Sequence, residues 1–119
     1  MTGPRIIDFQ TPCPGETAPV DPARVVAGAP LATTVNRYAE AGNRFFAGEW
    51  SSTVGIWRIH YTEHEFCQLL EGRVRLTSDC GEQWQFEAVD AWGIPAGVTG
   101  TWETVTPARK RYAIYEPAD

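Results

Sequence analysis

Hydrophobic and polar residues alternate through the middle of the chain, in residues 55–72. A period of two over this length is typical of a β-strand rather than a helix. One face of the predicted strand is mostly apolar or aromatic, with a single carboxylate among the rings. That face comprises Trp57, Ile59, Tyr61, Glu65, Cys67 and Leu69.

Further alternating runs extend to residue 116, separated by turn residues such as Cys80-Gly81 and Pro95 to Gly97. Gly72 joins two runs, and a glycine there lets the backbone bend where a side chain would obstruct it. The predicted strands cover residues 44–50, 55–62, 65–72, 73–79, 82–88, 90–95, 99–105 and 109–116. Short strands without intervening helices predict an all-β antiparallel barrel or sandwich closed on itself.

The first 30 residues differ from the rest, because they are rich in Pro, Gly and Ala and lack a sustained period. We expect residues 1–30 to form an irregular N-terminal arm that lies on the barrel or on a partner subunit. Residues 31–119 then form a single barrel domain. A short helical turn is expected around residues 36–41.

Composition and charge narrow the possible partners. The chain has 119 residues, 43% of them hydrophobic, and a net charge of -5. No run of 18 apolar residues occurs, so we expect no membrane span, and the acidic balance argues against a nucleic-acid partner. The N-terminus has no signal-like segment, and the three cysteines form no CxxC pair. These features predict a cytoplasmic protein with free thiols.

The motifs from residue 61 onward resemble the cupin superfamily. Glu65 and Gly72 are separated by six residues, and DAWGIPAG follows at residues 90–97. The stretch from about residue 45 to 116 is similar to small single-domain, RmlC-like cupins of unknown function, which are related in sequence to ureidoglycine aminohydrolases. The resemblance implies a cupin double-stranded β-helix, that is, a jelly-roll barrel. It also implies that two copies pair through an outer sheet, so we expect a homodimer.

Of the usual cupin metal ligands, only the Glu and at most one His are present at the positions that the resemblance assigns to them. A metal-binding cupin has two histidines before the Glu and a third after the Pro-x-Gly turn. Those positions hold Ile59 and Tyr61, or Arg58 and His60 with the longer spacing, and finally Gly100. Gly100 should leave room where a ligand would otherwise stand. We therefore predict no metal and no other cofactor, because a transition-metal site needs three or more converging donors.

His60 and His64 leave an alternative open. On a straight strand both point away from Glu65, toward solvent. A bend at Thr62 would bring the two imidazoles to Glu65 and create a metal site, and a structural role through hydrogen bonds is a further possibility.

Glu65 is the strongest candidate for chemistry. If it points inward, it is a carboxylate in an aromatic cavity, where burial favours the neutral form unless a cation is near. Lys110, on the closing strand, is the candidate cation, and the resembling subfamily has a Lys at the matching place. With Tyr61 they supply an acid, a base and a phenolic donor. The alternatives are a structural carboxylate for Glu65 and, for Lys110, an exposed basic run from Arg109 to Arg111.

Four more residues are assigned to ligand binding, namely Trp57, Cys67, Trp102 and Tyr112. Core packing is the competing explanation for the tryptophans, because each ring can bury on the order of 200 Å². Cys67 is equally consistent with a small buried hydrophobic residue.

Two functions remain open. The first is a metal-independent enzyme that acts on a small nitrogenous or sugar-like metabolite by acid and base chemistry. The second is a non-catalytic module that binds or senses a small molecule, and a purely structural dimeric protein is a third possibility. The pattern leaves open whether the protein is an enzyme, because one fold hosts many chemistries.

Overall fold

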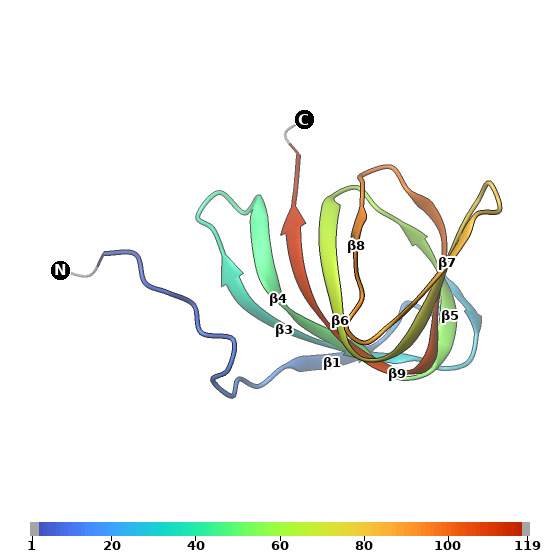
Figure 1. Cartoon of the computed structure of the whole chain (residues 1–119), viewed down its shortest axis with the longest axis horizontal. Coiled ribbons are helices and arrows are strands. Elements are labelled where there is room, and N and C mark those ends of the chain that lie inside the picture. The colour runs from blue at the N-terminus through green and yellow to red at the C-terminus, as the bar shows by residue number, and fades with distance from the viewer. Residues whose placement is uncertain (1–2, 118–119) are drawn as a thin grey trace.

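The computed structural model describes residues 3–117. In this range nine β-strands form one curled antiparallel sheet, and no helix is present (Figure 1). The strands are β1 (Glu16–Pro19), β2 (Val25–Ala27), β3 (Leu31–Ala39), β4 (Phe45–Ser52), β5 (Gly55–His60), β6 (His64–Ser78), β7 (Gln83–Glu87), β8 (Ala91–Ile94) and β9 (Thr99–Tyr115). The predicted all-β barrel is confirmed. The helical turn predicted around residues 36–41 is wrong, because most of that segment belongs to β3 and pairs with β4.

Two long strands, β6 and β9, organise the sheet. Each merges two of the predicted strands and bends, and the two pair along most of their lengths. On its other edge β9 pairs first with β5 and then with β4. Gly72 marks the bend in β6 with a φ of 89°, and a Cβ there would overlap the carbonyl oxygen of Pro107. This position therefore requires glycine, as the pattern predicted.

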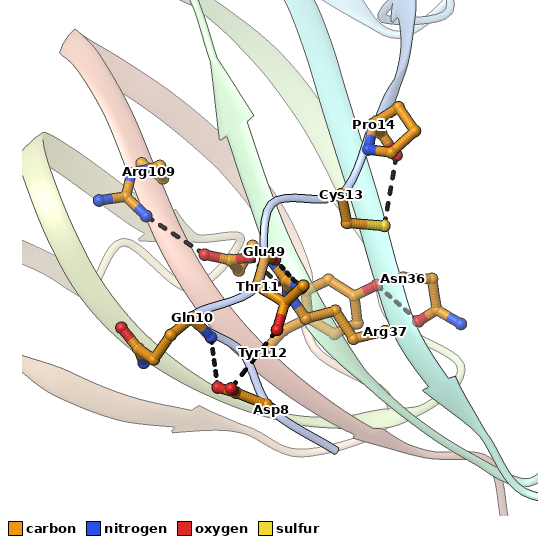
Figure 2. A network of polar contacts seen from close by, with 10 residues as sticks. All are labelled: Asp8, Gln10, Thr11, Cys13, Pro14, Asn36, Arg37, Glu49, Arg109 and Tyr112. Carbon is orange, nitrogen blue, oxygen red and sulfur yellow. Dashed lines mark hydrogen bonds and ion pairs between the residues drawn. The ribbon is translucent and has the colours of Figure 1, made fainter.

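The N-terminal stretch contributes two short strands to the sheet. β1 pairs with β3, and β2 pairs with β5. The preceding residues, Asp8 to Pro14, pass beside β3 and β4 (Figure 2). There the Arg37 guanidinium donates to the Thr11 carbonyl oxygen at 2.7 Å and lies over the Phe9 ring. Within residues 3–30 the arm is therefore irregular apart from β1 and β2, which are part of the sheet.

The core lies inside the curled sheet, where the inward faces of the long strands meet. Alternation decides which side chains enter it: along β5 and β6, the odd-numbered residues of the predicted inner face are the buried ones. No helix in residues 3–117 is long and apolar enough to cross a membrane. The most buried apolar residues include Trp57, Cys67, Leu69, Val74, Leu76 and Trp102.

Candidate functional site

A cavity of about 410 Å³ opens into the barrel. This volume lies within the range of small-molecule sites. Its walls come from β3, β4, β5, β9, the start of β6 and the connection before it, together with a residue from the N-terminal stretch. Six predicted site residues line it: Trp57, Tyr61, Glu65, Trp102, Lys110 and Tyr112.

Glu65 and Lys110 meet inside this cavity. The Lys110 ammonium donates to Glu65 Oε2 at 3.0 Å, and the two side chains are only 5% and 7% exposed. The pair forms because β6 and β9 each turn one of these residues inward. The neighbouring Arg109 points outward and binds Glu49 and Glu71. The alternative that Lys110 belongs to an exposed basic run is therefore wrong.

Two indole rings surround the Lys110 ammonium. Its nitrogen lies 4.6 Å from the ring centroid of Trp102 and 5.0 Å from that of Trp50. At such distances the negative face of an indole attracts a cation, and the attraction is stronger away from water. Trp50 was not among the predicted site residues. Alternation places Gly48, Trp50 and Ser52 on one face of the strand, but only the pairing of β4 with β9 puts Trp50 opposite Lys110.

The electrostatics of the site keep Lys110 charged. Burial alone would lower the pKa of the Lys110 ammonium, but the nearby acidic groups of Cys67, Glu65 and Tyr61 outweigh burial and raise it. Burial raises the pKa of the Cys67 thiol to about 12, against the opposing effect of Lys110. Burial likewise raises the pKa of the Tyr61 phenol above its ordinary value. At neutral pH the ammonium beside Glu65 therefore also faces a neutral thiol and a neutral phenol.

The two tyrosines of the cavity have different surroundings. The Tyr112 hydroxyl donates to Asn36 Oδ1 at 2.7 Å, which orients the ring from β3. Burial, with a smaller effect of the Glu65 charge, raises the pKa of Tyr112 to about 12. Tyr61 follows the end of β5 and is partly exposed at the cavity. Tyr61 is thus the phenol better placed to donate a proton or hydrogen bond to a ligand.

Comparison with known families identifies the fold. The model of the EutQ-like cupin domain family matches residues 39–112, which is more than half of the chain. The chain belongs to the EutQ-like cupin family. No curated protein matches it.

Solved structures of other proteins share the fold of this EutQ-like cupin. A protein of unknown function from Pseudomonas syringae pv. tomato, of the DUF861 family, is 24% identical with a TM-score of 0.79 over 91% of this chain and 46% of that one. The EutQ protein of Clostridium difficile is 17% identical with a TM-score of 0.66 over 73% and 64%. A DUF861 family protein from Thermotoga maritima is 31% identical with a TM-score of 0.53 over 54% and 73%. The cupin thus spans about half the length of the Pseudomonas protein.

The residues of this cupin do not fit a metal site of the usual cupin kind. Ile59 and Tyr61 offer no imidazole, and a Cβ at Gly100 would overlap the carbonyl oxygen of Thr77. The expectation that Gly100 leaves room for a ligand is therefore wrong, because β6 and β9 pair closely there. No three His, Cys, Asp or Glu side chains converge anywhere in the described range. The cation beside Glu65 is the Lys110 ammonium.

The two histidines do not form a metal-ligand cluster with Glu65 in the part of the chain that the structure describes. His64 Nδ1 accepts a hydrogen bond from the backbone N–H of Ala96 at 3.1 Å, and its ring stacks on Tyr115. His60 is exposed and reaches the lining of the cavity. The bend between β5 and β6 does not bring the two imidazoles together with Glu65.

Cys67 is the predicted ligand-binding residue that the cavity does not reach. Its side chain is fully buried and is absent from the cavity lining. Its sulfur lies 3.4 Å from the Lys110 nitrogen, on the core side of the pair. Cys67 is therefore a buried thiol of the core that accepts a hydrogen bond from the Lys110 ammonium.

Proposed function

We propose that this cupin is an enzyme that transfers protons on a small nitrogenous or sugar-like metabolite. The observation that supports it is the Glu65–Lys110 pair, whose atoms lie 3.0 Å apart inside a cavity of ligand size. A carboxylate beside a fixed cation combines a base with a group that stabilises negative charge. Tyr61 adds a phenolic hydroxyl at the same cavity.

The step that suits these groups is removal of a proton from carbon bonded directly to a carbonyl group. The Glu65 carboxylate takes the proton, and the electron pair of the C–H bond moves toward the carbonyl oxygen. The Lys110 ammonium and the Tyr61 hydroxyl then stabilise the negative charge on that oxygen. Return of the proton from Glu65 to the same or a neighbouring atom completes the exchange or isomerisation, so no oxidant or reductant is required.

Deuterium exchange tests this proposal without knowledge of the natural substrate. A panel of small ketones, keto acids, ureides and keto sugars is incubated with the protein in deuterium oxide, and uptake is followed by proton NMR. We expect exchange next to the carbonyl of at least one compound. Tyr61→Phe should slow it about 100-fold, the typical effect of losing one donor to a developing oxyanion. Tyr115→Phe, which alters an exposed phenol outside the cavity, is the matched control. A lack of protein-dependent exchange across the panel contradicts the proposal.

A non-catalytic binding module is the second candidate, and one observation favours it. The opposite charges of Glu65 and Lys110 cancel each other. The neighbouring acidic groups raise the pKa of Lys110, so its ammonium does not readily give up a proton. Indole rings of Trp50, Trp57 and Trp102 line the same cavity and would report a ligand by fluorescence. Saturable quenching by a compound that shows no deuterium exchange would favour binding over catalysis.

A further inference from the structure

Arg24 reaches the cavity from outside the predicted barrel domain. It ends the turn before β2 and lines the same cavity as Glu65 and Lys110. Two hydrogen bonds with Arg58, a residue of β5, fix its position. The Arg58 backbone N–H donates to the Arg24 carbonyl oxygen at 2.9 Å, and Arg24 Nε donates to the Arg58 carbonyl oxygen at 3.0 Å. The N–H and the carbonyl oxygen of Arg58 are thus both hydrogen-bonded to Arg24, one to its backbone and the other to its side chain.

This arrangement leaves the outer edge of the Arg24 guanidinium free. Only Nε is used by the Arg58 carbonyl, and Arg24 forms no ion pair with the residues that the structure describes. The Arg58 side chain, by contrast, points to Asp79 and binds it at 3.3 Å. The two Nη groups of a guanidinium form a planar pair of donors that matches the two oxygens of a carboxylate. A guanidinium whose orientation is already fixed loses less entropy when it binds.

Arg24 is the cation of the cavity lining that forms no ion pair within residues 3–117, although the lining holds two carboxylates. Lys110 and Glu65 cancel each other inside it. The other acidic group of the lining is Glu63, whose pKa is raised by burial and by the neighbouring Glu116. His60 lines the cavity as well and offers a further N–H donor.

We propose that the cavity binds a small carboxylate, with the Arg24 guanidinium holding the carboxylate group and the uncharged end lying beside Glu65, Lys110 and Tyr61. This inference names the ligand class of the proposed function and rests on the same cavity. It assigns a specificity role to a residue of the N-terminal stretch.

Matched pairs of ligands test the role of Arg24. The probes are pyruvate, 4-oxopentanoate and 6-oxoheptanoate, each compared with its primary amide, which has the same chain length and no charge. Binding to the full chain is measured by calorimetry. For at least one pair, we expect the acid to bind about tenfold more tightly than the amide, because charge-assisted hydrogen bonds exceed neutral ones.

Substitutions separate recognition from a structural role. Arg24→Gln should reduce the preference for the acid to about onefold, and Arg24→Lys should retain part of it. Arg73→Gln, which removes an arginine outside the cavity, is the matched control for net charge and should leave the preference unchanged. A merely structural Arg24 would change both affinities equally.

Two results overturn the proposal. One is an acid preference that persists in Arg24→Gln; the other is that no acid binds more tightly than its amide, which includes the case in which neither binds. A failure of the deuterium exchange leaves this test unaffected, because exchange reports on Glu65 and Tyr61 whereas the acid preference reports on Arg24. A preference for acids without exchange would remove only the catalytic proposal.

Discussion

Replacing Lys110 by Met should strongly destabilise the fold. The side chain lies 3.0 Å from Glu65 Oε2 and is 5% exposed. At that separation, an effective dielectric constant of about 20 gives an attraction of about 5.5 kcal/mol. Removing one partner of a buried pair typically costs about 3–5 kcal/mol, because the other charge stays buried without compensation. Domains of this size have free energies of unfolding of about 5–15 kcal/mol, so Lys110→Met should lose a large share of the total.

Urea unfolding followed by tryptophan fluorescence measures this loss. The decisive comparison is the double variant Glu65→Gln with Lys110→Met, which removes both charges and should recover most of the stability that either single variant loses. Glu87→Gln breaks the exposed pair with Arg73 and is the control, with an expected loss below about 1 kcal/mol. A loss of less than about 1 kcal/mol for Lys110→Met, or single-variant losses that simply add in the double variant, would show that the buried pair does not stabilise the fold in this way.

Three further predictions concern pH, metal and assembly. The free energy of unfolding should fall between pH 9 and pH 12, because the pKa of the Cys67 thiol rises from 9.0 to about 12 on folding and only the unfolded chain releases this proton there. The Cys67 thiol contributes a slope of about 1.4 kcal/mol per pH unit. Cys67→Ser should therefore reduce the pH dependence of the free energy of unfolding. Cys13→Ser, which changes an exposed thiol, is the control and should leave that dependence unchanged. Elemental analysis of protein purified without chelator should find less than stoichiometric transition metal; a full equivalent would contradict the assignment of Lys110 as the cation at Glu65. We also propose a homodimer, because the exposed aromatic residues Phe45, Phe66 and Tyr115 lie on adjacent strands β4, β6 and β9; sedimentation as a monomer would contradict it.

Much of the barrel could be predicted from the sequence because alternation has a local cause. In a strand, successive side chains point to opposite faces, so the inward phase of Trp57, Glu65 and Cys67 follows from their spacing alone. Gly72 was recognisable for a similar reason, since a glycine between two alternating runs permits a backbone that other residues resist. The segment around residues 36–41 was misread, because its local preference was overruled by pairing between β3 and β4.

The site could be predicted only in part. Glu65 was predicted on the inner face and Lys110 was a candidate partner, yet their contact depends on the register between β6 and β9, which no local pattern specifies. Trp50 and Arg24 were missed for the same reason, since each reaches the cavity only through strand pairing. Cys67 has the predicted phase but lies too deep to meet a ligand.

The sequence by itself determined the strands from about residue 44 onward, the inward face of β5 and of the first half of β6, and the lack of a full set of metal-binding histidines at the cupin positions. These follow from residue types and spacings that act over a few neighbours. Only the tertiary structure decided that Lys110 occupies the place beside Glu65 and that Gly100 is pressed against the backbone of β6. It also decided that the N-terminal stretch adds Arg24 to the cavity. Each of these depends on which strands lie side by side, and that is set by packing of the whole barrel rather than by any one segment.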